Sequence, residues 1–284
     1  MKQIKEIQGY ELDHLDPNEI KRVLVGFSDV HGNLEAWNAF VQEVNNIKEL
    51  FPNAFFNAIG LGDYVDYGPD SVQVLERIVE EFHADQLLAG NHDMLIYDLV
   101  NDTFGKDSKT TNISPHFKRL KGTRGRISAM LVVDQIKESP NAMSILSMIC
   151  NGSLVRYRSN ADYNLYCCHG SIDDVLWGDG MEITASQLDD LFINANPSIV
   201  LCGHTHIPGI KMIDDKNAIV NVGSIGQPRD GNPFGCFAAI YETADILYVK
   251  FHRFAYNCKR TIEKIKLNMP QQHPYYGERL LAGK

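Results

Sequence analysis

The sequence predicts an α/β fold in which polar side chains gather where strands end. Short apolar runs bounded by glycine or turn residues recur between residues 22 and 203, as expected for buried strands. Between the early runs, apolar residues repeat at three- and four-residue steps and form one face of a helix. Strands that alternate with helices favour a parallel sheet with right-handed crossovers.

Each predicted strand leads into a polar cluster. The strands are expected at 22–27, 56–62, 86–90, 163–168 and 198–203. The side chains that follow them are, in the same order, Asp29 and His31; Asp63; Asn91 and His92; His169; and His204 with His206. Ligands of such folds gather beyond the carboxyl ends of the strands, so we expect these clusters to lie close together.

Two amphipathic stretches supply the early helices, at 34–50 and 71–82. In both, the apolar residues fall on one face, and Pro69 and Asp70 form a start signal before the second.

The later part of the chain departs from this alternation. Residues 101–160 contain two predicted helices, at about 114–137 and 141–150, without a strand between them. We interpret 101–160 as a helical insertion over the site. The remaining expectations are an antiparallel hairpin at 235–254, a closing helix at 258–268 and an irregular tail from Met269.

Composition limits the classes of function. The 284 residues are 44% apolar and 22% charged, which is typical of a globular protein. The formal net charge of −9 argues against a protein that grips a nucleic-acid polymer. An anionic substrate would need local cations, which bound metals would supply.

The compartment is expected to be the cytoplasm. We find no apolar run of about 18 residues, so no membrane span or membrane partner is predicted. The polar N-terminus lacks the apolar core of a signal peptide. The six cysteines form no CxxC pair, and several lie in apolar runs, which suits reduced, buried thiols.

Half of the ten histidines stand at strand ends, a distribution that packing alone explains poorly. The other five, at positions 14, 83, 116, 252 and 273, are scattered and are interpreted as surface or packing residues. Imidazoles mixed with carboxylates and an amide oxygen suit borderline divalent metals better than Ca²⁺ or a thiolate-bound structural zinc.

The polar blocks resemble, in order and in strand-end context, those of the calcineurin-like metallophosphoesterase superfamily. The blocks are Asp-Val-His-Gly-Asn at 29–33, Gly-Asp-Tyr-Val-Asp at 62–66, Gly-Asn-His-Asp at 90–93, His-Gly at 169–170 and Gly-His-Thr-His at 203–206. The resemblance implies a four-layer α/β/β/α sandwich, with 1–284 as a single domain and 101–160 as a helical cap within it.

The resemblance also implies roles for the clustered side chains. The ligands of a first metal would be Asp29, His31 and His206. Those of a second would be Asn91, His169 and His204, with Asp63 bridging the two. The ions would be Mn, Fe or Zn, and a metal-bridging hydroxide would attack phosphorus. His92 would stay unligated and donate a proton to the leaving group. Asp66 either orients His92 or caps its own loop.

Departures from subfamily patterns bear on the substrate. Tyr67 and Ala89 stand where Ser/Thr protein phosphatases usually carry phosphate-clamping arginines, and Asp93 stands where they carry Glu. Losing a bidentate donor counts against a phosphoprotein phosphatase, which remains the alternative. The segments 67–70 and 221–231 are more similar to a bacterial branch near the diadenosine tetraphosphatases. Arg229 would then bind phosphate, unless it is an ordinary exposed loop residue.

The insertion carries a local reversal of charge. Between Asp107 and Asp134 there is no acidic residue, but there are six cations: Lys109, Lys118, Arg119, Lys121, Arg124 and Arg126. They form either a solvated helix face or a lid that binds a polyanion. Tyr64 and Tyr67 either stack on a base or belong to the core.

The predicted function is therefore hydrolysis of small phosphate esters or anhydrides, with a nucleotide such as diadenosine tetraphosphate as substrate. A non-catalytic scaffold is the alternative of another class. Such a scaffold would be expected to have lost ligands or His92, and all are present.

Overall fold

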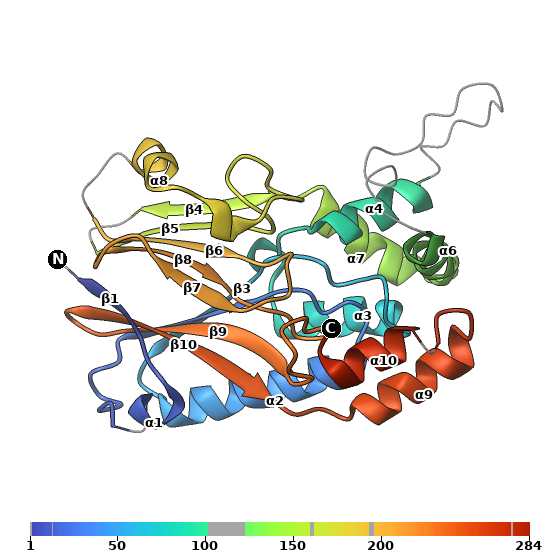
Figure 1. Cartoon of the computed structure of the whole chain (residues 1–284), viewed down its shortest axis with the longest axis horizontal. Coiled ribbons are helices and arrows are strands. Elements are labelled where there is room, and N and C mark those ends of the chain that lie inside the picture. The colour runs from blue at the N-terminus through green and yellow to red at the C-terminus, as the bar shows by residue number, and fades with distance from the viewer. Residues whose placement is uncertain (1, 13, 102–122, 160–161, 193–195, 274) are drawn as a thin grey trace.

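Two five-stranded sheets lie face to face, with helices on both outer sides (Figure 1). This computed structural model describes all residues except 1, 13, 102–122, 160–161, 193–195 and 274. The predicted sandwich of four layers is confirmed. In the first sheet the order is β1 (Gln3–Glu6), β10 (Ile246–Phe254), β9 (Gly235–Glu242), β2 (Arg22–Phe27) and β3 (Phe55–Gly60). In the second it is β4 (Val155–Ser159), β5 (Asn164–Cys168), β6 (Ser198–Cys202), β8 (Asn217–Asn221) and β7 (Gly209–Met212).

Parallel pairing among the described strands joins those that lead into the polar clusters, β8 and one edge pair. β2 pairs in parallel with β3, and β6 pairs in parallel with both β5 and β8. The parallel edge pair is β1 with β10. The predicted hairpin at 235–254 is confirmed as β9 and β10.

The strand predicted at 86–90 is wrong. A 3₁₀ turn, η1 (Ala84–Gln86), occupies its beginning, and only an isolated bridge joins Leu87 to Gly60. The Gln86 side-chain amide donates to Asn57 Oδ1 at 2.9 Å and to the Ala58 carbonyl at 3.0 Å. These side-chain bonds take the place of a backbone ladder, although both leucines of the run are buried.

The outer layers contain the predicted helices. α2 (Leu34–Leu50) lies outside the first sheet and α8 (Ala185–Leu191) outside the second (Figure 1). The remaining helices are α1 (Gly9–Leu12), α3 (Ser71–Glu81), α4 (Asn91–Val100), α6 (Thr123–Lys137), α7 (Pro140–Cys150), α9 (Cys258–Asn268) and α10 (Tyr275–Ala282), with a 3₁₀ turn, η2, at Gly180–Glu182. α6 and α7 pack against α3 and α4, and the predicted residues 114–122 lie outside the described part of the chain.

The sequence predicts an irregular tail from Met269. This prediction is wrong, because the tail contains α10. Met269, Tyr276 and Leu280 are buried against Ile265 of α9 in a small apolar cluster. A short helix without a long apolar pattern is stabilised here by tertiary packing rather than by propensity.

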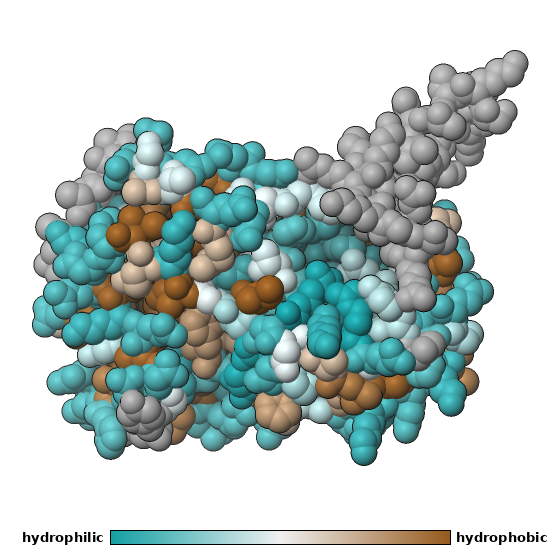
Figure 2. Space-filling model, in the orientation of Figure 1, coloured by the Kyte–Doolittle hydropathy of each residue, from teal (hydrophilic) through white to brown (hydrophobic). Residues whose placement is uncertain are grey.

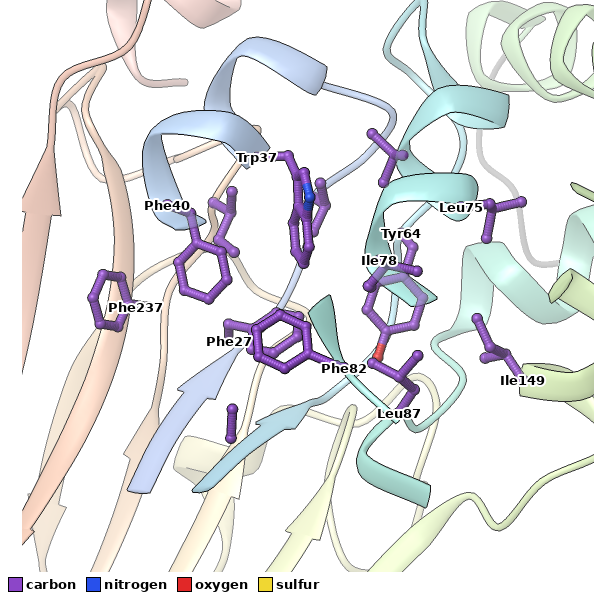
Figure 3. Packing of buried hydrophobic residues seen from close by; sticks show 14 of the residues in the cluster. Phe27, Trp37, Phe40, Tyr64, Leu75, Ile78, Phe82, Leu87, Ile149 and Phe237 are labelled. Atoms are coloured by element: carbon purple, nitrogen blue, oxygen red, sulfur yellow. The ribbon is translucent and has the colours of Figure 1, made fainter. Parts of the chain in front are cut away.

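Aromatic packing fixes the carboxyl end of β2 (Figure 3). The Phe27 ring lies 5.7 Å from Trp37, 4.9 Å from Phe40 and 5.0 Å from Phe82, measured between ring centroids. All four rings are buried. Because Asp29 follows Phe27 by two residues, this cluster holds the first polar loop in place.

The two sheets approach closely at the same end. A Cβ added to Gly26 of β2 would meet the Leu201 and Val222 side chains at 3.1 Å each, which is tighter than ordinary van der Waals contact. Glycine at this position therefore lets the loop after β2 come near the loop after β6.

The surface and the cysteines fit the composition. The centre of the face in Figure 2, beside the C-terminal end of the chain, is strongly hydrophilic, and hydrophobic side chains show as small separate groups.

All six cysteines are free, and five are buried. Across the described parts of the chain, we find no helix with the length and apolarity needed to cross a membrane.

Candidate metal centre

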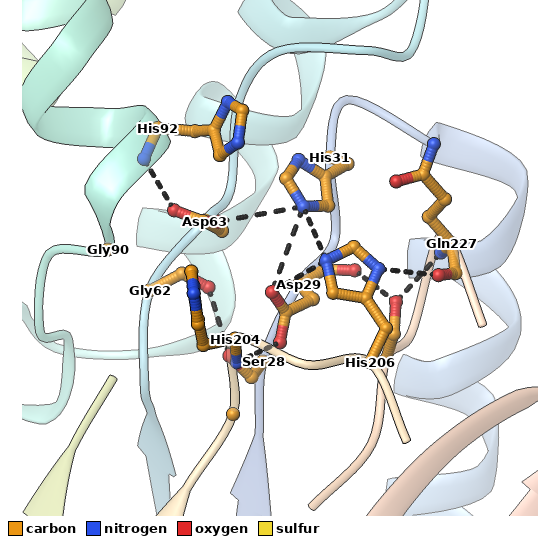
Figure 4. A network of polar contacts seen from close by, with 12 residues as sticks. Ser28, Asp29, His31, Gly62, Asp63, Gly90, His92, His204, His206 and Gln227 are labelled. Atoms are coloured by element: carbon orange, nitrogen blue, oxygen red, sulfur yellow. Dashed lines mark hydrogen bonds and ion pairs between the residues drawn. The ribbon is translucent and has the colours of Figure 1, made fainter. Parts of the chain in front are cut away.

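The structure brings the predicted polar clusters together at one edge of the sandwich (Figure 4). Asp29 and His31 follow β2, and Asp63 follows β3. Asn91 and His92 begin α4. The last three, His169, His204 and His206, follow β5 and β6.

One group consists of Asp29, His31 and His206, all buried. Asp29 Oδ1 lies 3.2 Å from His206 Nε2 and 3.7 Å from His31 Nε2. The two Nε2 atoms are 3.2 Å apart. Three potential donor atoms thus face a common point.

A second group consists of Asp63, His169 and His204. His169 Nε2 lies 3.3 Å from Asp63 Oδ2 and 3.3 Å from His204 Nδ1. Asn91 Oδ1 lies 2.9 Å from each of these two ring nitrogens. Asn91 therefore joins this group.

Asp63 connects the groups. Its Oδ2 atom is 3.3 Å from His169 Nε2 in the second group and 3.6 Å from His31 Nε2 in the first. A carboxylate in this position can contact two ions at once and reduce the repulsion between them.

Backbone carbonyls fix the orientation of three imidazoles. His31 Nδ1 faces the Val65 carbonyl at 3.1 Å, His169 Nδ1 that of Leu61 at 2.9 Å, and His206 Nδ1 that of Gln227 at 2.6 Å. A carbonyl can only accept, so in the neutral ring the proton sits on Nδ1 and the Nε2 lone pair points to the site. This is how ligating histidines are usually held.

The loops that carry these residues have unusual backbone conformations. Every non-glycine residue with positive φ in the described chain is here, with φ from 49° to 72°: Asp29, His31, Asp63, Asp66, Tyr67, His204 and His206. Left-handed conformations are costly for such residues and gather at functional sites.

Two glycines allow the loops after β3 and before α4 to touch. A Cβ on Gly62, whose φ is 107°, would collide with the Gly90 backbone, and a Cβ on Gly90 would collide with Asp63. No larger residue fits this crossing.

Asp93 is a residue whose role the sequence did not predict. Its buried carboxylate accepts N–H groups from Asp63 at 2.7 Å, from Gly90 at 2.9 Å and from Tyr64 at 2.9 Å. Burial, together with the Asp63 charge, raises the pKa of Asp93 to about 7. Asp93 thus ties the Asp63 loop to α4. Its place beside His92 in the block was the only signal available.

Buried groups set one another's charge. Burial alone would raise the pKa of Asp29, but His206 beside it holds that pKa well below its usual value. Burial disfavours a charged His169, yet the Asp63 carboxylate raises its pKa to about 9. Burial and the nearby Arg229 lower the pKa of His206 to about 3. An anionic Asp29 beside a neutral His206 is a donor pair that suits borderline divalent cations.

One buried atom supports a fit to a metal ion. Asp29 Oδ1 makes no hydrogen bond within the part of the chain that the structure describes. An unsatisfied buried oxygen is costly, and in Asp29 it is the oxygen that faces the two Nε2 atoms of the first group. A cation there would satisfy it.

His92 and Asp66 contact each other beside the two ligand groups. Their contact joins His92 Nδ1 to Asp66 Oδ2 at 2.7 Å. Asp66 Oδ1 also accepts the Tyr67 N–H at 2.7 Å, so Asp66 contacts both His92 and its own loop. Burial disfavours a charged His92, but Asp63 and Asp66 outweigh it and raise its pKa.

A second unpredicted residue comes from the insertion. Ser128 of α6 donates to Asp66 Oδ1 at 2.6 Å and accepts the Tyr67 N–H at 3.1 Å. Nothing local in the sequence marked Ser128, because its partners are about 60 residues away.

Arg229 also reaches this edge. Its guanidinium carbon lies 5.9 Å from the centre of the Tyr67 ring, and Nη2 donates to Gln227 Oε1 at 3.0 Å. Its Nε is buried and unpaired among the described residues. Burial lowers the pKa of Arg229. It is therefore not an ordinary exposed loop arginine.

The tyrosines differ. The idea that Tyr64 stacks on a base is wrong, because its side chain is fully buried beside Phe27. Tyr67 packs between His31, His92 and Tyr276 at centroid distances of 4.7, 4.6 and 5.1 Å.

The predicted cationic lid lies outside what the structure describes. Lys109, Lys118, Arg119 and Lys121 fall in 102–122, and the side chains of Arg124 and Arg126 are not described either.

Comparisons with known proteins agree with this geometry. A family model described as calcineurin-like phosphoesterase matches residues 23–208. An uncharacterised protein of Methanocaldococcus jannaschii is 27% identical over 286 residues, covering 93% of this chain and 100% of that protein.

Two solved structures have a similar fold. A metallophosphoesterase from Sphaerobacter thermophilus is 22% identical, with a TM-score of 0.63, and the match covers 93% of this chain and 99% of that one. A hypothetical protein from Pyrococcus horikoshii is 16% identical, with a TM-score of 0.67, over 92% and 98% of the two chains. Because the family model spans more than half of the sequence, including both ligand groups, this chain belongs to the calcineurin-like phosphoesterase family.

Proposed function

We propose that this protein is a two-metal phosphoesterase that hydrolyses esters or anhydrides of small phosphorylated molecules. One observation carries the proposal: Asp63 Oδ2 lies 3.3 Å and 3.6 Å from ring nitrogens of two separate ligand groups. A single structural metal would not need a carboxylate shared in this way.

The ligands would divide between two ions. Asp29, His31 and His206 would hold one ion, Asn91, His169 and His204 the other, and Asp63 would contact both. When bound, such a pair supplies an activated water and positive charge opposite the phosphoryl oxygens. Mn, Fe and Zn all suit these nitrogen and oxygen donors.

The chain's own residues would act on the leaving group and the phosphate. His92 would donate its Nε2 proton to the departing oxygen, with Asp66 holding Nδ1. Arg229, whose buried Nε has no hydrogen-bond partner among the described residues, would bind a phosphoryl oxygen through charge-assisted hydrogen bonds. The cap formed within 101–160 would support this arrangement through Ser128.

Nucleotide-type anhydrides such as diadenosine tetraphosphate are the first substrates to test. Their support is the resemblance of segments 67–70 and 221–231, together with the place of Arg229 at the site. The burial of Tyr64 removes one expected base contact, so a base would need other partners.

The experiment compares substrates on manganese-loaded protein. We expect turnover of 4-nitrophenyl phosphate, its bis-ester or diadenosine tetraphosphate. No turnover of any of them, with two ions per chain measured by elemental analysis, would contradict the proposal. A preference for phosphopeptides above about tenfold in kcat/KM, roughly 1.4 kcal/mol, would favour the phosphoprotein phosphatase.

His92→Asn tests the role of the unligated histidine. General acids contribute about 10²–10⁴-fold, so we expect a loss of about 100-fold in kcat on an alkyl phosphate. The loss should be smaller on 4-nitrophenyl phosphate, whose leaving group needs little protonation. An equal rate for variant and wild type on both substrates, with unchanged metal content, would remove His92 from the mechanism.

A further inference from the structure

A cavity separate from the candidate metal centre lies where the edges of the two sheets meet. Its volume is about 520 Å³, within the usual range for small-molecule sites of about 300–1,000 Å³. β2 and β3 of the first sheet line it, with β4 and β5 of the second and η1 between them. Arg22 opens β2 and Asp29 follows its end, so these two residues are roughly 20 Å apart at about 3.3 Å per residue.

Positive charge gathers in this cavity, although the whole chain carries a net charge of −9. Three arginines line it, Arg22, Arg156 and Arg158, against one carboxylate residue, Asp85. Arg156 Nε donates a hydrogen bond to the Asp85 carbonyl at 2.8 Å. This bond fixes the side chain through Nε and does not use its two terminal nitrogens.

Arg22 is incompletely hydrogen-bonded among the described residues, although its side chain is 25% exposed. Its Nε and Nη1 atoms are buried and form no hydrogen bond within the described chain. The nearest carboxylate oxygen to Nη1, Glu242 Oε2, is 3.5 Å away, and the other oxygen of Glu242 is engaged by Lys2 at 2.6 Å. Buried donors without acceptors are costly, so an anion in the cavity would lower the free energy of this group.

The remaining walls suit a flat apolar group. Leu24, Ile59 and Leu165 contribute aliphatic surface from three strands. Tyr163, which lines the cavity and is buried in the same cluster as these three residues, adds an aromatic ring. Rings held in this way offer a rigid face to an aromatic ligand.

We propose that this cavity binds a small molecule in which a flat ring carries a phosphate group, such as an aryl or nucleoside monophosphate. Guanidinium groups match phosphate through paired hydrogen bonds, and the aliphatic and tyrosine walls receive the ring. None of the residues that line the cavity is a candidate metal ligand, so a ligand here does not take part in the reaction at the metals. This proposal stands independently of the proposed function.

The probe is 4-bromophenylphosphonate, which has a flat ring and a dianionic group but no ester bond to hydrolyse. In crystals soaked with it, we expect a bromine anomalous peak in the arginine-lined cavity, whether or not another appears at the metals. In solution, calorimetry on metal-loaded protein should show a binding event that Arg156→Gln/Arg158→Gln weakens at least tenfold. Turnover of 4-nitrophenyl phosphate should stay unchanged in this variant.

Two controls test whether binding depends on the charges of the cavity arginines and of the ligand. Arg77→Gln removes an exposed arginine of α3 that pairs with Glu80 and should bind like wild type. The neutral 4-bromobenzyl alcohol should bind at least tenfold more weakly than the phosphonate. A bromine peak at the metals alone, or equal affinity in the double variant and in Arg77→Gln, would overturn the proposal. If the double variant unfolds, Arg156→Gln alone gives the same comparison.

Discussion

A serine from the insertion takes part in the His92–Asp66 pair. Ser128 donates to one oxygen of Asp66 while His92 contacts the other. The same hydroxyl accepts the Tyr67 N–H. Ser128 therefore positions the carboxylate that holds His92, without contacting the ligand groups itself.

Replacing Ser128 with Ala should lower kcat by about tenfold, about 1.4 kcal/mol, with little change in KM, because Asp66 loses a donor but phosphate binding does not. Steady-state kinetics on an alkyl phosphate measure this split. Ser128→Thr keeps the hydroxyl and should retain most of the activity. Equal losses in the two variants, or a loss confined to KM, would show that Ser128 only supports packing.

The candidate metal ligands were predictable from the sequence, and the residues that support them were not. The seven expected ligands stand in short blocks at strand ends, where sequence order and local chemistry coincide. Asp93 and Ser128 act through backbone groups of distant loops, so their roles depend on which loops meet. That information arises only when the chain folds.

At the scale of elements, predictions are confirmed where local sequence patterns determine the structure, and they are wrong where contacts between distant segments determine it. β2, α2 and α3 have strong local periodicity and were predicted within two residues. The run at 86–90 has a buried strand's composition, but Gln86 side-chain bonds replace its ladder. α10 lacks a long apolar repeat and is held by α9 and the Tyr67 loop, contacts that no local pattern reports.

The role of α10 can be tested at Tyr276, which is 2% exposed and packs on Tyr67. Tyr276→Ala should lower the free energy of unfolding by roughly 3 kcal/mol, the usual cost of removing a buried aromatic ring. Chemical denaturation measures this. The matched control is Tyr275→Ala, since Tyr275 is 37% exposed and should cost less than half as much. If the two variants are equally stable, α10 is not packed as described.

At the scale of the whole molecule, one buried histidine links stability to pH. His252 of β10 stacks on Phe237, with centroids 4.9 Å apart, and its Nε2 lies 2.8 Å from the Tyr241 hydroxyl. Burial, with a smaller effect of Lys250, lowers its pKa to about 3. The folded protein therefore keeps His252 neutral where the unfolded chain, with an ordinary pKa of about 6.5, binds a proton.

The direction in which stability changes with pH follows from this difference in pKa. The contribution of His252 to stability is complete above about pH 6.5 and declines as pH falls toward 3. Between pH 7 and pH 5, wild type should lose about 2 kcal/mol more than His252→Gln, as measured by urea denaturation. The exposed His14, replaced by Gln, controls for general acid effects and should follow wild type. Parallel losses in all three proteins would contradict the assignment.

Both candidate ligand groups draw on the two sheets at once. Asp29 and His31 extend from the first sheet and His206 from the second, and Asp63 faces His169 and His204 in the same way. An ion bound in either group would hold the two sheets together at this end of the sandwich. His31 and His206 are 175 residues apart along the chain, so the site forms only when the chain folds, and the free energy of ion binding adds to the stability of the folded state. Cation loading and resistance to unfolding would then rise together, and any opening of the sandwich at this end would release both ions.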